Sequence, residues 1–159
     1  MSELDTLAAR VAARLVARQE TIGVVESSAG GLIAAALLAV PGASRYFLGG
    51  AVVYTATARE AFLGIGRDGM AGLRSSSEPY AELLAGRIRE QLGTTWGLAE
   101  TGAAGPDGNR YGDPAGHSCV AVAGPARHVA TIETGSPDRA ANMTAFAIAA
   151  LSALEARLA

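Results

Sequence analysis

The sequence predicts an α/β domain, a three-layer α/β/α sandwich built on a mixed, mainly parallel sheet of about five strands. Short β-branched runs alternate with amphipathic stretches of helical length, the pattern of strands connected by helices. The last two strand-like runs are separated by only Gly124–Arg127, a spacing typical of an antiparallel hairpin, so the sheet should be mixed. Half of the residues are hydrophobic and 18% are charged, which indicates one folded domain spanning residues 1–159.

The first half of the chain begins with a predicted helix over Met1–Arg18, where leucine, alanine and valine form one apolar face and arginines point away. Thr21–Glu26 is short and β-branched and predicts a buried strand. A second helix over Leu32–Val40 should end before Pro41, because the residue preceding a proline avoids the α conformation. The next predicted elements are a strand around Ala51–Thr55 and a short helix over Thr57–Leu63.

The second half continues with a helix that has Pro79 in its first turn and Ser76 or Ser77 as its cap. A third strand is predicted at Thr95–Ala99. The segment Glu100–Gly116 is too rich in glycine for regular structure, and long ordered loops usually serve a site. The remaining elements are strands at Cys119–Ala123 and His128–Thr134 and a final helix capped by Ser136, with Pro137 at its first position and a buried stripe of Met143, Ala147, Ala150, Leu154 and Leu158.

Composition disfavours several classes of function. A net charge of −2 with scattered arginines gives no field for nucleic acid, and no apolar run reaches the roughly 20 residues needed to cross a membrane. We therefore expect a cytoplasmic protein. The single cysteine, Cys119, cannot form an internal disulfide and lies in an apolar run typical of a buried thiol. No cluster of residues has metal-ligand spacing, so neither a metal nor another cofactor is expected.

The chain contains no lysine, and all 13 of its basic side chains are arginine. A buried lysine can become a neutral base near physiological pH, whereas a guanidinium stays charged and binds carboxylates or phosphates. The sequence therefore excludes any mechanism that needs a neutral side-chain amine.

The segment Glu26–Gly31 follows a predicted strand, and in open α/β sheets ligands bind beyond the carboxyl ends of the strands. It offers hydroxyl groups, glycine backbone and amide donors at a helix start, which suits an anion or an amide. The alternative is a turn of small residues with a helix cap.

A second polar region combines Ser44 with Tyr54 and Arg59 downstream. A serine acts as a nucleophile only when a base takes its proton. Arg59 is a poor base, and an unperturbed phenol is too weak near neutral pH. The alternatives are that Ser44 is a turn serine and Arg59 a solvated helix charge.

In the third region, Gly102, Gly105 and Gly108 permit backbone amides to face a substrate, and Asp107 can accept hydrogen bonds from ribose hydroxyls. The segment matches neither a Walker phosphate loop nor a dinucleotide fingerprint. Ordinary turns are the alternative.

Taken in order, these segments resemble the C-terminal domain of the competence/damage-inducible protein CinA, a family whose active members are nicotinamide mononucleotide deamidases. The family pattern Glu-Ser-Cys-Thr-Gly-Gly is matched by Glu26–Gly31, and Pro-Gly-Ser-Ser by Pro41–Ser44. The family loop Ser-Gly-Ile-Ala-Gly-Pro-Asp-Gly is matched by Thr101–Gly108, and the helix start Val-Ser-Glu-Pro by Ser76–Pro79. The resemblance implies a mixed sheet between helical layers, a homo-oligomer, and hydrolysis of a nicotinamide amide to the carboxylate with release of ammonia.

The resemblance also implies a serine–lysine dyad, with the serine at Ser44 and the neighbouring tyrosine at Tyr54. The family segment Tyr-Ser-Asn-Glu-Ala-Lys is replaced by Tyr54–Arg59, so arginine occupies the position of the base. His117 is the candidate replacement base, because its ordinary pKa is near neutral; the alternative is a histidine that faces solvent at a strand edge. The substrate-binding candidates are Glu26, Ser27, Ser28, Gly30, Gly31, Thr101, Gly102, Gly105, Asp107 and Gly108.

Three functional hypotheses remain at this point. In the first, the chain is a serine amidohydrolase acting on a nicotinamide mononucleotide-like small molecule, with Ser44 as nucleophile and amides near Gly30 or Gly105 as oxyanion donors. In the second, the pocket binds such a nucleotide without hydrolysing it. In the third, the chain is a purely structural homologue whose glycine segments are ordinary turns.

Overall fold

The computed structural model describes residues 1–159 and contains one five-stranded sheet of order β2-β1-β3-β4-β5. The strands are β1 (Ile22–Glu26), β2 (Phe47–Val52), β3 (Trp96–Ala103), β4 (His117–Ala123) and β5 (His128–Glu133). β1 pairs in parallel with β2 and β3, while β4 is antiparallel to both β3 and β5. Four strands therefore run in one direction and only β4 is reversed, which confirms the mixed, mainly parallel sheet.

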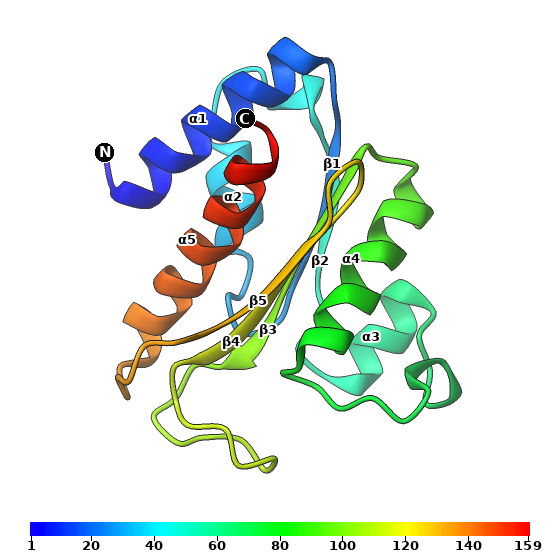
Figure 1. Cartoon of the computed structure of the whole chain (residues 1–159), viewed down its shortest axis with the longest axis vertical. Coiled ribbons are helices and arrows are strands. Elements are labelled where there is room, and N and C mark those ends of the chain that lie inside the picture. The colour runs from blue at the N-terminus through cyan, green and yellow to red at the C-terminus, as the bar shows by residue number, and fades with distance from the viewer.

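Helices cover both faces of this sheet (Figure 1). The helices are α1 (Glu3–Arg18), α2 (Leu32–Leu38), α3 (Ala56–Leu63), α4 (Glu78–Leu92) and α5 (Arg139–Arg157). α1, α2 and α5 cover one face over a cluster of 25 buried hydrophobic residues, and α3 and α4 cover the other over a cluster of 13. The three-layer α/β/α prediction is confirmed, and the first of these layers supplies most of the core.

The structure corrects three element boundaries. β2 lies at Phe47–Val52 rather than Ala51–Thr55, because Gly49 and Gly50 belong to the strand and pair with β1. β3 continues to Ala103, so Glu100 is a strand residue and not part of a loop. α5 is capped by Asp138, whose side chain accepts a hydrogen bond from the Ala141 amide, rather than by Ser136.

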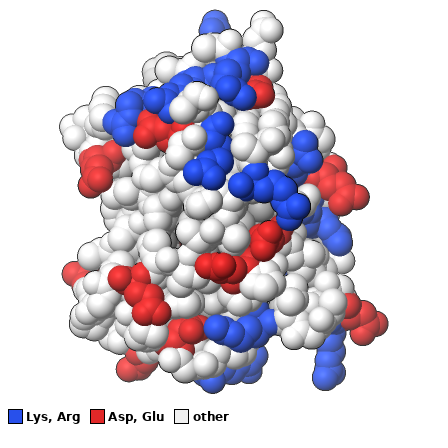
Figure 2. All heavy atoms as spheres, in the orientation of Figure 1, with Lys and Arg blue, Asp and Glu red and all other residues white.

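The carboxyl ends of β1, β2 and β3 meet at one edge of the sheet, here called the carboxyl edge, which lies at the bottom of Figure 1. The loop 104–116 between β3 and β4 and the segment 64–77 between α3 and α4 extend from the same edge. Both charge signs are interspersed over the face in Figure 2, without a broad patch of either. None of the helices is long and apolar enough to cross a membrane.

Candidate functional site

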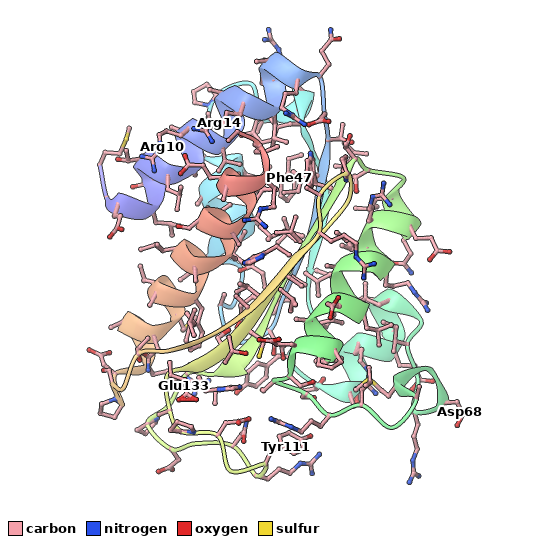
Figure 3. The ribbon with its side chains drawn as sticks, viewed as in Figure 1. Arg10, Arg14, Phe47, Asp68, Tyr111 and Glu133 are labelled. Carbon is pink, nitrogen blue, oxygen red and sulfur yellow. The ribbon has the colours of Figure 1, made fainter.

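A cavity of about 900 Å³ opens at the carboxyl edge. Strand ends contribute Ser27, Tyr54 and Thr101 to its wall, α3 contributes Arg59, and α4 contributes Tyr80. The remaining wall residues come mainly from the segment 64–77 and the loop 104–116, where Figure 3 labels Asp68 and Tyr111. These residues are Val53, Thr55, Ala56, Arg67, Asp68, Met70, Ala71, Gly72, Leu73, Ser75, Ser76, Gly102, Asn109, Arg110 and Tyr111.

Glu26 fixes the start of α2 from below the cavity. Its carboxylate is 1% exposed and accepts hydrogen bonds from the backbone amides of Gly31 (3.1 Å), Ile33 (2.9 Å) and Ala34 (2.9 Å). These donors are among the amides that a helix N-terminus leaves unsatisfied. Burial raises the pKa of Glu26, and the three amides oppose the rise. Glu26 therefore holds the loop rather than contacting a ligand.

Glu100 holds the same loop from β3 and is fully buried. One carboxylate oxygen accepts from the amides of Ser27 (3.0 Å) and Ala29 (2.7 Å), and the other accepts from the hydroxyls of Ser28 and Ser118. Burial raises the pKa of Glu100, while the hydrogen bonds from Ser28, Ala29 and Ser27 lower it. All four donors converge on one side chain, so the position of Ser27 is defined by β3 as well as by β1.

The two carboxylates engage most of the loop amides. The Ser27, Ala29 and Gly31 amides donate to Glu100 or Glu26, and the Gly30 amide donates to the Ser27 carbonyl at 3.2 Å. The Ser28 amide is the one member of this series without a protein acceptor. This N–H is therefore the backbone donor of the loop that the protein leaves unpaired.

Tyr54 is positioned by a residue from the far end of the chain. Arg139, the first residue of α5, donates from one terminal nitrogen to the Tyr54 hydroxyl (3.1 Å) and from the other to the Gly105 carbonyl (2.6 Å). The Tyr54 oxygen therefore accepts from a cation, which leaves its own O–H free to donate. Arg139 connects β2, the loop 104–116 and α5 at the cavity.

Arg59 is the buried cation of the cavity wall, with only 9% of the residue exposed. Its Nε donates to the Ile65 carbonyl at 2.9 Å, and no aspartate or glutamate lies within ion-pair distance of its guanidinium. Burial raises the pKa of Tyr80, and the adjacent Arg59 guanidinium opposes that rise. The alternative prediction, that Arg59 is a solvated charge on its helix, is wrong because α3 turns this side chain inward.

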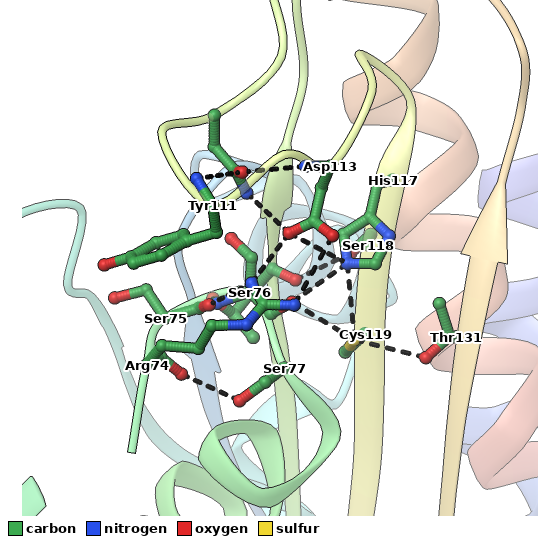
Figure 4. A network of polar contacts seen from close by, with 12 residues as sticks. Arg74, Ser75, Ser76, Ser77, Tyr111, Asp113, His117, Ser118, Cys119 and Thr131 are labelled. Atoms are coloured by element: carbon green, nitrogen blue, oxygen red, sulfur yellow. Dashed lines mark hydrogen bonds and ion pairs between the residues drawn. The ribbon is translucent and has the colours of Figure 1, made fainter. Parts of the chain in front are cut away.

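Ser76 occupies a left-handed backbone conformation (φ 57°) beside the cavity and is held on both sides. Its amide donates to the Thr101 hydroxyl at 3.1 Å, and its carbonyl accepts from His117 Nε2 at 2.9 Å (Figure 4). A non-glycine residue at positive φ persists where its surroundings impose it, commonly near functional sites. The polar network thus fixes one wall of the cavity.

An ion pair connects the two segments of the cavity mouth. Arg74 donates to Asp113 at 2.7 Å, and its guanidinium stacks 5.1 Å from the Tyr111 ring centroid (Figure 4). Burial raises the pKa of Asp113, but hydrogen bonds from Arg74 and Asn109 and the charge of His117 leave it below its ordinary value. These contacts join the segment 64–77 to the loop 104–116 across the mouth.

The structure brings five of the predicted site residues to one cavity: Ser27, Tyr54, Arg59, Thr101 and Gly102. Outside its lining lie Ser44, Glu26, Ser28, Gly30, Gly31, Gly105, Asp107, Gly108 and His117. Several of these glycines have a packing reason. A Cβ on Gly108 would lie 2.2 Å from the Asp113 carbonyl oxygen, and one on Gly30 would lie 2.7 Å from Met143.

The structure does not bring Ser44 together with Tyr54 and Arg59 within the chain. Ser44 lies in a 3-10 turn (Ala43–Arg45) before β2, at the amino edge of the sheet, whereas Tyr54 follows the end of β2. The six residues of β2 separate them by roughly 20 Å at the rise of an extended strand. Ser44 and Arg59 of the same chain therefore do not contact one small ligand.

His117 does not face solvent, as one of the two predictions had it. It is also not placed to act as a base in the cavity. It is 6% exposed, and its Nε2 donates to the Ser76 carbonyl, which can only accept. Its Nδ1 lies 3.3 Å from a carboxylate oxygen of Glu133. Both ring nitrogens face protein acceptors, so neither presents a lone pair to a ligand. His117 instead supports Ser76.

Sequence reasoning missed Glu100, Arg139 and the segment around Ser76 as site residues. Glu100 was assigned to a glycine-rich loop, and the signal in the sequence was a lone carboxylate at the end of an apolar strand. Arg139 gave no signal, because an arginine in the first turn of a helix resembles any exposed charge. Tyr80 was expected on a helix stripe, and it packs in the core while also lining the cavity.

The fold and cavity together define an α/β protein with a ligand pocket at the carboxyl edge of a mixed sheet. Residues 4–158 match the family model of the CinA C-terminal domain. The chain therefore belongs to the CinA C-terminal domain family.

Similar proteins agree with this assignment. A CinA-like protein of Gloeobacter violaceus is 43% identical over 76% of the chain, and one from Anaeromyxobacter sp. is 40% identical over 89%. The chain spans only 28% and 35% of these two relatives. A CinA superfamily protein of Klebsiella pneumoniae superposes with a TM-score of 0.91 at 26% identity, covering 99% of this chain and 98% of that one.

Proposed function

We propose that the cavity binds a nicotinamide mononucleotide-like ligand without appreciable hydrolysis of its amide. Family membership and the placement of Ser27, Tyr54 and Arg59 on one wall support the binding of such a ligand. The proposed lack of hydrolysis rests on the chemistry of the cavity wall. Its titratable side chains are Arg59, Arg67, Arg110, Asp68, Tyr54, Tyr80 and Tyr111. Among them, the residue at the family's lysine position is a guanidinium.

Hydrolysis would begin with attack of the Ser27 oxygen on the carboxamide carbon. The new oxygen–carbon bond forms as the serine proton passes to a base. The base then returns this proton to the amide nitrogen, and the carbon–nitrogen bond breaks as ammonia leaves. Water then hydrolyses the acyl-serine to the carboxylate and restores the hydroxyl. Arg59 cannot accept the proton, and losing general-base assistance typically slows such a step by about 100-fold to 10,000-fold. Asp68 is exposed on the segment 64–77 and is no substitute for a buried base.

A slow deamidase is the second candidate, favoured by the Ser27 loop. Ser27 lines the cavity, and the Ser28 amide beside it has no protein acceptor. This pair matches a nucleophile with an oxyanion donor, even where the base is missing. In this reading Ser27, and not Ser44, is the nucleophile.

The test is to incubate purified protein with nicotinamide mononucleotide and follow ammonia and the deamidated product. We expect little turnover in the wild type and at least about a tenfold gain in Arg59→Lys, since lysine can serve as the base. Adding Ser27→Ala to Arg59→Lys should abolish that gain, while adding Ser44→Ala as the matched control should leave it unchanged. Any turnover of the wild type should persist in His117→Ala, because His117 does not act as the base.

Fast wild-type turnover that requires Ser27 and does not rise in Arg59→Lys would contradict the proposal. Activity that depends on Ser44 would contradict the assignment of the site. Absence of both turnover and saturable binding would leave the purely structural hypothesis.

A further inference from the structure

Arg59 presents an unusual charge in the cavity. Arginine is almost never buried without a partner, yet Arg59 is 9% exposed and has no carboxylate within ion-pair distance. Its Nε donates to the Ile65 carbonyl, and the residue lines the cavity beside Tyr80. A buried cation of this kind is compensated when a ligand supplies the anion.

The groups around Arg59 are mainly hydrogen-bond donors. The Tyr54 oxygen already accepts from Arg139, so its O–H is the part offered to a ligand. The Thr101 oxygen accepts from the Ser76 amide, which likewise leaves its O–H free. Ser27 adds a third hydroxyl, and the Ser28 amide lies next to it without an acceptor. A ligand group that accepts several hydrogen bonds is therefore well suited to this wall.

A carboxylate and a carboxamide differ on this point. A carboxylate has two acceptor oxygens and can take a bidentate pair from a guanidinium, whereas a primary amide has one acceptor oxygen and an NH₂ group that only donates. An amide at Arg59 must turn its NH₂ toward other donors, with no negative charge to offset the cation. The difference favours the carboxylate.

Given the proposed nucleotide-binding function, we propose that this pocket selects a pyridine mononucleotide carrying a ring carboxylate over the corresponding carboxamide. Arg59 is the specificity-determining residue, and its guanidinium binds the carboxylate. The more exposed Arg67 and Arg110 at the cavity mouth are available for the phosphate at the other end of the ligand. The favoured ligand is thus the carboxylate that hydrolysis of the amide would produce.

Titration calorimetry on the intact chain tests this proposal with two ligands, nicotinamide mononucleotide and its pyridine-3-carboxylate counterpart. We expect the carboxylate to bind at least about tenfold more tightly, as for a charge-assisted bidentate pair compared with a neutral contact. Arg59→Gln should remove most of this ratio by weakening the carboxylate ligand alone. Arg67→Gln is the matched control and should weaken both ligands equally.

The outcomes separate this inference from the proposed function. If neither ligand binds, the nucleotide-binding function fails and the selectivity with it. If both bind within threefold of one another, or the amide binds more tightly, only the selectivity fails. Equal weakening of both ligands in Arg59→Gln would assign Arg59 to the phosphate and overturn the proposal. Should Arg59→Gln not fold, the ratio in the wild type decides alone.

Discussion

The floor and the mouth of the cavity are held by different forces. Here the floor means the Ser27–Gly31 loop, of which Ser27 lines the cavity. The buried carboxylates of Glu26 and Glu100 fix this loop and the start of α2 through five backbone amides and one hydroxyl. The mouth is formed by the segment 64–77 and the loop 104–116, joined by the partly exposed Arg74–Asp113 pair. Buried, hydrogen-bonded carboxylates are costly to disturb, whereas surface pairs contribute little to stability. The floor should therefore govern folding, and the mouth should govern affinity.

The largest effect is expected from Glu100→Ala. This change leaves the Ser27 and Ala29 amides without acceptors inside the protein and creates a cavity, so the free energy of unfolding should fall by about 3 kcal/mol or more. Glu100→Gln is the matched control. Its carbonyl oxygen can accept both amides, and its NH₂ can donate to the Ser28 and Ser118 oxygens, so the loss should be about 1 kcal/mol or less. Chemical denaturation measures both, and equal losses would contradict the role of Glu100.

Glu26→Gln should cost more than Glu100→Gln. Every donor to Glu26 is a backbone amide, so either orientation of glutamine turns NH₂ toward an N–H group. We expect a loss of about 1–3 kcal/mol in the same denaturation measurement. A loss smaller than that of Glu100→Gln would show that the two carboxylates are not distinguished by their donors.

The pH dependence of stability should sharpen the same contrast. Burial raises the folded-state pKa of Glu100 above its ordinary value of 4.5, so the native state binds this proton more tightly than the unfolded chain. Ionisation of Glu100 therefore destabilises the wild type as pH rises from about 4.5 through the raised folded pKa. Glutamine does not ionise, so Glu100→Gln should gain stability relative to the wild type over that range. A difference that is constant or falls with pH would contradict the raised pKa.

The smallest effect on stability is expected at the mouth. Arg74→Ala removes the pair with Asp113 and the stacking on Tyr111, which should change the free energy of unfolding by about 1 kcal/mol or less. Ligand affinity should fall severalfold, because Tyr111 and Arg110 line the cavity on the released loop. Calorimetry and denaturation on the same variant compare the two effects. A large loss of stability with unchanged affinity would reverse the proposed division between floor and mouth.

Much of the fold could be predicted because local patterns agreed with the final packing. The β-branched run that forms β1 and the cap at Ser77 both appear where the sequence placed them. The second strand was predicted around Ala51–Thr55, whereas β2 is Phe47–Val52 and includes Gly49 and Gly50. Gly49 has a packing role, because a Cβ at this position would lie 3.3 Å from Leu92 of α4. A packing constraint between β2 and α4 leaves no recognisable pattern in the sequence around the glycine.

The site was harder to predict than the fold. The grouping of Ser44 with Tyr54 followed from the family resemblance, but β2 carries the chain across the sheet between them. Glu26 and Ser28 have the polar character of ligand contacts, and their partners proved to be backbone amides and Glu100. Whether a polar group faces inward or toward a ligand depends on distant strands, which periodicity does not report.

The reversal of β4 has a consequence for how this domain can vary. Because β4 runs opposite to β3, the loop 104–116 leaves and re-enters the sheet at the same edge. Residues can be added to or removed from this excursion without shifting the register of any strand. The loop at the cavity mouth can therefore change in length and sequence, and with it the ligand that is bound, while the sheet and its helical layers stay the same.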